Sequence, residues 1–201
     1  MKAASHERDT RKTSRTLAPV RSGVRAMVKA IIIAVIPSMM FFCCPGKVGA
    51  EQEYLIKAAF LYNFAKFIVW PSAVFGDAAT PLGICVIGRN RFGNALGTLK
   101  NKTVEGKPIV VRKSEKIEDI NRCHILFISA SEKENLPQIL KAIRGAPVLT
   151  VGDTDGFARS GVMINLVPIG NRIGFEINLT AVEETPLKIS SKLLKLGKTI
   201  R

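Results

Sequence analysis

The chain has few of the side chains on which most enzymes depend. Its 201 residues include two histidines and four cysteines, and after residue 50 only His124, Cys85 and Cys123 remain. His124 directly follows Cys123 in an apolar run typical of a strand, where neighbouring side chains point to opposite faces, so the two make a poor nucleophilic pair. One imidazole and two thiols are also too few for a zinc site. We therefore expect no catalytic residues, no metal and no cofactor.

A long hydrophobic run is missing as well. The uncharged apolar stretch from Ala30 to Phe42 has 13 residues and contains Pro37, whereas a membrane-spanning helix needs ~20. A basic segment precedes it, and the small residues Val48 to Ala50 follow, which is the pattern of a signal peptide. We expect residues 1–50 to be a signal peptide with its apolar region at 30–42 and cleavage after Ala50, rather than a retained anchor. The mature, exported protein would be the domain at 51–201.

Acidic residues are scarce relative to basic ones, at 16 against 30. Residues 1–50 account for much of this excess, because 21 basic and 14 acidic residues remain without them. The remaining Lys and Arg are scattered, and no aromatic residues interleave them as a stacking platform for bases. We expect a solvated basic surface and no nucleic-acid partner.

Short apolar runs alternate with helical patterns along the mature chain. Strands are predicted at 82–88, 108–112, 123–129 and 147–151, with helices at 53–69, 92–99 and 132–144. Strands that alternate with helices favour a mainly parallel sheet covered on both faces. Val162 to Val167 and Arg172 to Leu179 flank a turn signal, which predicts an antiparallel hairpin at one edge. The expected fold is a single three-layer α/β domain with a mixed, mainly parallel sheet, helices on both faces and a C-terminal antiparallel hairpin.

Two helices have defined apolar patterns. The helix at 53–69 has an expected core stripe of Ile56, Phe60, Phe64, Phe67 and Ile68, which Lys57 interrupts. A closing helix capped by Ser190 or Ser191 would face the core with Leu193, Leu194 and Leu196. At the rim of the first helix, Tyr62, Lys66 and Trp70 are candidates for binding a protein partner. Core packing of the two aromatics and solvation of the lysine are the alternative.

Two segments resemble ligand loops. Asp153 begins a calcium-like Asp-Thr-Asp-Gly, but Ala158 and Ile164 replace the glycine and glutamate that such a loop requires, so a capping turn explains it better. Arg89, Asn90 and Arg91 follow a predicted strand at its carboxyl end, where open α/β sheets place ligands. They are candidates for a small anion site, and an ordinary turn is the alternative.

The two cysteines of the mature part allow two interpretations. In an oxidising compartment an even pair favours a disulfide between Cys85 and Cys123. The alternative is two buried free thiols on neighbouring strands.

Several blocks, taken in order, resemble the YfiR family of periplasmic regulators. They include Lys57 to Pro71 (KAAFLYNFAKFIVWP), Gly106 to Arg112 (GKPIVVR), Cys123 to Ser129 (CHILFIS) and Ile173 to Asn178 (IGFEIN). The similarity extends over nearly the whole mature chain, and the Trp-Pro helix end, the two strand cysteines and the FEIN strand are specific in combination.

This resemblance implies a regulator without enzymatic activity that is often a homodimer. It would bind the periplasmic sensing region of an inner-membrane diguanylate cyclase and repress it, so that biofilm formation through cyclic diguanylate would follow. An outer-membrane lipoprotein would capture the regulator and relieve the repression. The family's disulfide maps onto Cys85 and Cys123. Some members of the family serve sensor kinases. A periplasmic protein that binds a small molecule or anion and signals to a sensor kinase therefore stays an alternative.

Overall fold

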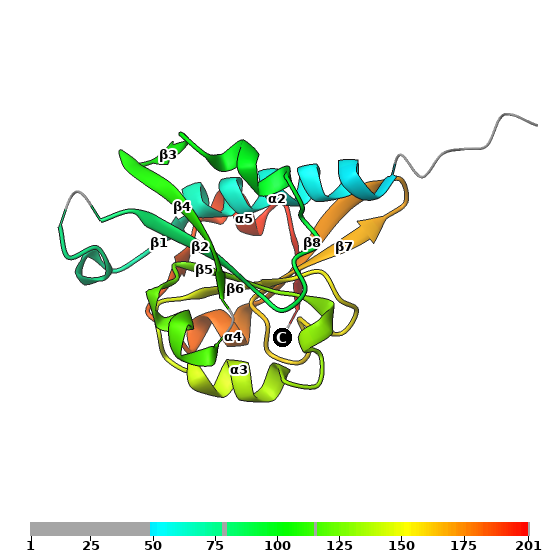
Figure 1. The fold of residues 1–201 in the computed structure, drawn as a ribbon. Helices are drawn as coiled ribbons and strands as arrows, with labels where there is room; N and C mark the ends of the chain where they lie inside the picture. Colours follow the sequence, from blue (N-terminus) through cyan, green and yellow to red (C-terminus); the bar gives the residue numbers. More distant parts are fainter. Residues whose placement is uncertain (1–48, 78–79, 115, 201) are drawn as a thin grey trace, which may run out of the picture. The chain divides into compact units, whose positions relative to one another are not determined.

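The computed structural model describes residues 49–77, 80–114 and 116–200, so all of the expected signal peptide except Gly49 and Ala50 lies outside the described residues. The described residues form an eight-stranded sheet with the order β10-β8-β7-β6-β5-β2-β4-β3 (Figure 1). Its strands are β2 (Leu82–Ile87), β3 (Thr103–Val104), β4 (Lys107–Ser114), β5 (Ile125–Ile128), β6 (Leu149–Gly152), β7 (Ile164–Ile169), β8 (Arg172–Asn178) and β10 (Lys198–Ile200). The expected single α/β domain with a mixed, mainly parallel sheet is confirmed.

Helices and short turns surround this sheet. The helices are α2 (Gly49–Phe67), α3 (Leu136–Ala142), α4 (Leu179–Glu183) and α5 (Ser191–Leu194). The short 3₁₀ helices are η1 (Ser72–Val74), η2 (Ala95–Leu99), η3 (Ile117–Arg122) and η4 (Ala130–Glu132). A separate pair of short strands, β1 (Ile68–Val69) and β9 (Lys188–Ile189), runs antiparallel and joins the end of α2 to the segment before α5.

The central strands are apolar because both of their faces are covered. Every residue of β2, β5 and β6 is buried, as expected for parallel strands between two helical layers. The pairs β4–β2, β2–β5, β5–β6 and β6–β7 are all parallel. Their carboxyl ends therefore meet at one edge of the sheet, which is where the polar residues described below gather.

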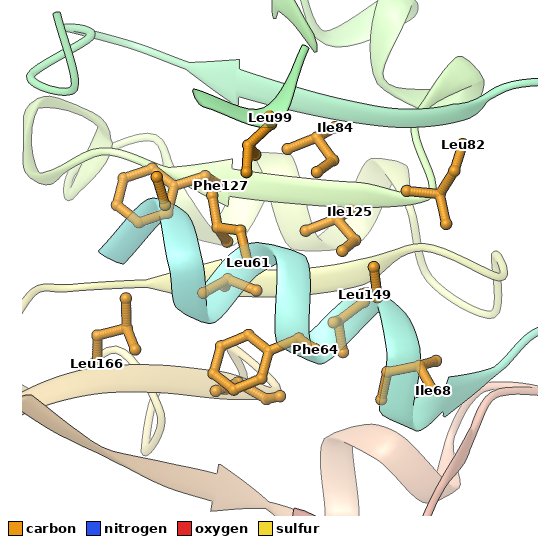
Figure 2. Packing of buried hydrophobic residues seen from close by; sticks show 14 of the residues in the cluster. Leu61, Phe64, Ile68, Leu82, Ile84, Leu99, Ile125, Phe127, Leu149 and Leu166 are labelled. Carbon is orange, nitrogen blue, oxygen red and sulfur yellow. The ribbon is translucent and has the colours of Figure 1, made fainter. Parts of the chain in front are cut away.

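Helix α2 covers one face of the sheet. Leu61 and Phe64 of α2, and Ile68 directly after it, point toward the strand residues Ile125 and Leu149 (Figure 2). The expected core stripe is only partly correct, because Ile56 is 43% exposed, whereas Lys57 is buried. The helix is rotated relative to the expected stripe so that the small residues Ala58 and Ala65 also face the sheet, which allows the helix to approach the strands closely.

The opposite face has its own apolar cluster. Leu136, Ile139 and Ile143 in and after α3 pack with Leu126 and Ile128 of β5. Because β5 alternates its side chains between the two clusters, it forms the centre of the three layers. Figure 1 shows α2 and α3 on opposite sides of the sheet.

The C-terminal end of the chain differs from expectation at two points. The predicted hairpin exists as β7 and β8, with Ile164 opposite Ile177. It is not the outermost element, however, because β10 pairs in parallel with β8 and covers that edge. Ser190 caps α5 as predicted and Leu193 is buried, but Leu196 is 71% exposed. The reason is that α5 ends at Leu194, so Leu196 no longer follows the helical spacing.

Candidate functional site

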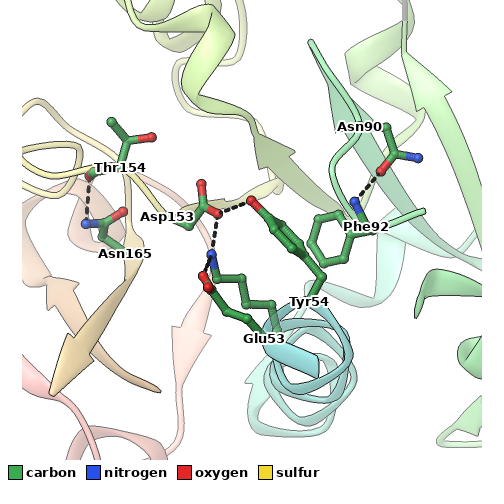
Figure 3. A network of polar contacts seen from close by, with 8 residues as sticks. Glu53, Tyr54, Asn90, Phe92, Asp153, Thr154 and Asn165 are labelled. Atoms are coloured by element: carbon green, nitrogen blue, oxygen red, sulfur yellow. Dashed lines mark hydrogen bonds and ion pairs between the residues drawn. The ribbon is translucent and has the colours of Figure 1, made fainter. Parts of the chain in front are cut away.

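A buried ion pair lies at the carboxyl edge of the sheet, beneath the first turns of α2. The Lys57 Nζ atom is 2.6 Å from Asp153 Oδ2, and both side chains are only 7% exposed. Tyr54 donates its hydroxyl to the same carboxylate oxygen over 3.0 Å. Lys57 also pairs with Glu53, whose Oε1 atom is 2.6 Å away. Figure 3 shows these contacts converging from α2 and from the end of β6.

The local sequence explains why these groups meet. Glu53 and Lys57 are four residues apart, so they lie on the same side of α2 in the order that favours an ion pair. Asp153 comes directly after β6, and its alternating pattern directs that side chain to the α2 face of the sheet. The ammonium of Lys57 also lies 4.4 Å from the centre of the Tyr54 ring, a distance typical of a cation–π contact.

The electrostatics keep both α2 side chains protonated. Burial alone would lower the pKa of Lys57, but its hydrogen bonds to Asp153 and Glu53 outweigh burial and raise the pKa above the usual value. Burial raises the pKa of Tyr54, and the negative charge of Asp153 raises it further. Lys57 therefore stays a cation and Tyr54 stays a hydrogen-bond donor. A charged lysine is not a nucleophile.

A hollow of about 600 Å³ opens beside this cluster. One wall comes from Ile56 and Lys57 of α2, and the other comes from Leu166, Pro168 and Arg172 of the β7–β8 hairpin. Its lining combines aliphatic side chains with the carboxylates of Glu53 and Asp153. An amphipathic group that carries a charge would suit such a lining.

The candidate anion residues lie at the same edge and make separate contacts. The backbone N–H of Arg89 donates to Ser131 Oγ over 2.9 Å, and Asn90 Oδ1 accepts from the N–H of Phe92. The Arg91 guanidinium lies over the Tyr54 ring, 5.6 Å from its centre. The expected helix at 92–99 is shorter, since η2 begins only at Ala95. Arg89 and Arg91 are exposed and stay a predicted anion site.

The candidate partner residues differ in their exposure. Trp70 is 9% exposed and packs against the rings of Phe75 and His124. It therefore offers little surface to a partner. Tyr62 is half-buried and Lys66 is exposed, with the Lys66 ammonium 5.2 Å from the centre of the Tyr62 ring. These two residues stay candidates for a protein contact.

The structure contains a disulfide between Cys85 on β2 and Cys123 just before β5, with their Cα atoms 5.8 Å apart. It lies in the cluster on the α3 face. His124 points the other way, as strand alternation predicts: its Nδ1 atom accepts from the N–H of Gly83 over 2.9 Å. Its ring stacks on Phe75 at 4.6 Å. Burial lowers the pKa of His124, and the positive charges of Arg112 and Lys107 lower it further.

Metal binding has no support from the part of the chain that the structure describes. No group of three or more His, Cys, Asp or Glu side chains comes together among residues 49–200 outside the gaps. Asp153, the first residue of the calcium-like segment, accepts hydrogen bonds from Tyr54 and Lys57 through Oδ2 instead. Likewise, none of the described helices is long and apolar enough to cross a membrane.

Sequence reasoning missed the ion pair itself. Lys57 counted as a polar interruption of an apolar stripe, and Asp153 as part of a turn. Two signals point to the pair: the Glu53–Lys57 spacing on a helix, and an aspartate directly after a buried strand. A lysine within an otherwise apolar helix face needs a buried partner, and a carboxylate at a strand end can supply it.

Fold and site together define a single-domain α/β protein with a buried ion-pair network at the carboxyl edge of its sheet. The chain belongs to the YfiR/HmsC-like family, whose family model matches residues 54–198. The resemblance found in the sequence is thereby confirmed.

Solved structures show only distant similarity. The ABC domain in complex with L-Trp from Streptococcus pneumonia aligns with 59% of this chain and 56% of its own, at 9% identity and a TM-score of 0.43. A conserved domain protein from Vibrio cholerae aligns with 59% of this chain and 54% of its own, at 13% identity and a TM-score of 0.42. This chain thus spans little more than half the length of either structure.

Proposed function

We propose that the protein is an exported regulator without enzymatic activity that binds the periplasmic sensing region of an inner-membrane signalling protein and holds it inactive. Membership of the YfiR/HmsC-like family over residues 54–198 carries this proposal. The receptor we favour is a diguanylate cyclase. Export would depend on the signal peptide predicted at residues 1–50.

The disulfide supports the periplasmic location. It joins two buried cysteines that are 38 residues apart in the sequence, and such bonds persist in oxidising compartments rather than in the cytosol. A regulator that waits between two membranes also benefits from a crosslinked core, because a disulfide reduces the conformational freedom of the unfolded chain.

Repression would act by differential affinity. The regulator must bind the inactive conformation of the receptor more tightly than the active one, because equal affinity for both would shift nothing. An outer-membrane lipoprotein that captures the regulator would then relieve repression by mass action.

The protein would act as a homodimer.

The decisive experiment reconstitutes a full-length membrane cyclase encoded near this protein into vesicles, with its sensing region outward. Adding the purified exported protein should lower cyclic diguanylate production in a saturable way, and the receptor should co-purify with it. A homologous regulator that does repress the same cyclase serves as the positive control. An unchanged rate together with no association would contradict the proposal.

A second candidate is a periplasmic protein that binds a small molecule or anion and reports to a sensor kinase. The exposed guanidiniums of Arg89 and Arg91 at the carboxyl edge of the sheet favour it, because ligands of open α/β sheets bind at that edge. Ligand-dependent binding to a kinase, with no effect on a cyclase, would select this candidate.

A further inference from the structure

Lysines gather around the last turns of α2. Lys66 belongs to the helix, and Lys100 and Lys102 follow η2 on one side. On the other side, Lys188 lies in β9, Lys192 in α5 and Lys195 directly after α5. All six are exposed. We call this surface the lysine face.

Contacts to α2 hold both sides of the lysine face in place. The Lys102 ammonium lies 4.8 Å from the centre of the Tyr62 ring, which Lys66 also approaches, and the Tyr62 hydroxyl donates to the carbonyl of Thr103. On the other side, the N–H of Ser190 donates to the carbonyl of Phe67 over 2.9 Å. Segments that are distant in sequence therefore place their lysines around one helix end.

The lysine face is also depleted of acids. Between Ile56 and Val104 the chain has a single acidic residue, Asp77, and from Pro186 to the last residue it has none. The exposed Glu105 is the one acid that follows closely after Lys102. The layer on the other face of the sheet differs, because η3 carries Glu118 and Asp119 beside Arg122. The two sides of the domain therefore differ in charge, although basic residues occur on both.

The type of cation indicates the kind of partner. All six residues are lysines, whereas protein interfaces are depleted of lysine and use arginine to bind carboxylates in a fixed geometry. Flexible ammonium groups suit the diffuse negative charge of a lipid surface, which attracts clusters of lysines. Two aliphatic side chains are exposed nearby, Val69 at 58% and Leu196 at 71%, and apolar groups beside a basic patch strengthen such contacts.

We propose that the lysine face docks the protein on anionic phospholipid headgroups. Docking would restrict the search for a membrane receptor to the membrane plane. Membrane docking is a property separate from receptor binding. Its test needs no receptor, so membrane docking and receptor binding can each fail without the other.

The test measures binding of the protein, in the form in which cells accumulate it, to vesicles of phosphatidylcholine with or without phosphatidylglycerol. We expect binding only to the anionic vesicles, with release as the salt concentration rises. Lys66→Gln combined with Lys102→Gln should weaken binding about 30-fold, since each lysine near an anionic surface contributes about fivefold.

Lys133→Gln combined with Lys141→Gln is the matched control, because both residues are exposed on the other layer, in and before α3. It removes the same charge and should change binding less than about twofold. Circular dichroism and thermal unfolding verify that both variants fold. Equal losses in the two variants, equal binding to neutral vesicles, or no binding to anionic vesicles would each overturn the proposal.

Discussion

Lys57 and Asp153 form a buried ion pair across 96 positions of the sequence, with 2.6 Å between Nζ and Oδ2. This contact fastens the first helix to the carboxyl end of the sheet. Removing one member leaves the other charge buried with fewer partners, which costs more than the intact pair contributes.

Asp153→Asn should lower the free energy of unfolding by about 3 kcal/mol, because Lys57 stays charged in a buried site. Urea denaturation measures the change. Glu53→Gln is the matched control: it makes the same chemical change at the other partner of Lys57, but the Glu53 side chain is 47% exposed. It should cost less than about 1 kcal/mol. Equal losses of unfolding free energy in the two variants would mean that burial does not distinguish the two contacts of Lys57.

The same cluster predicts a stability loss in alkali. The pKa values of Lys57 and Tyr54 are raised in the folded protein above ordinary values of 10.5 and 10.0. Their contribution is therefore fully present below those values and is lost as the pH rises through the folded pKa values. Urea midpoints measured across this alkaline pH range should fall more steeply with rising pH for the wild type than for Asp153→Asn. Parallel curves would mean that the Lys57–Asp153 cluster does not cause the loss of stability.

His124 predicts the opposite behaviour in acid. Burial, Arg112 and Lys107 lower its pKa below the ordinary value of 6.5. Its neutral form is favoured in the folded state, so its contribution is present above 6.5 and is lost as the pH falls through the folded pKa. In His124→Asn, where the amide oxygen can still accept from Gly83, the free energy of unfolding should depend less on pH in this range. A dependence equal to that of the wild type would assign the effect to other groups.

The disulfide predicts a large effect of reduction. Closing a loop of 38 residues stabilises a fold by about 4 kcal/mol in the chain-entropy account. Dithiothreitol should therefore lower the melting temperature markedly. The double variant Cys85→Ala with Cys123→Ala should have a low melting temperature that dithiothreitol does not change further. If reductant leaves the wild type unaffected, the two thiols are free in solution.

The arginines at 89 and 91 predict a response to anions. If they bind a small anion, a ligand at 100 times its dissociation constant stabilises the protein by about 2.7 kcal/mol. Thermal shifts with phosphate and nucleotides measure this. Arg89→Glu with Arg91→Glu should abolish the shift, and Arg144→Glu, at an exposed position after α3, should retain it. Shifts that survive the double reversal would place the site elsewhere.

The sequence predicts the layers of this fold better than its polar core. The strands β2, β5 and β6 are predictable because continuous apolar runs of strand length between turn residues are typical of a buried parallel sheet. Strand β10 is not predictable, since Lys198 to Ile200 is short and partly polar and gains its structure from pairing with β8. The Lys57–Asp153 pair depends on which way α2 rotates over the sheet. Periodicity favours the large aromatic residues, whereas packing buries Ala58 and Ala65.

The antiparallel pair β1–β9 determines when the domain can become compact. Ile68, directly after the first helix, pairs with Ile189, and Phe64 packs against Phe175. The residues that cover α2 therefore include some near the C-terminus. A chain that is released N-terminus first cannot bury α2 fully until nearly the whole chain has been released. Contacts between such distant segments slow folding. If the protein is exported as we propose, this slow folding would keep the polypeptide unfolded during transport, and its native core would form only after transport.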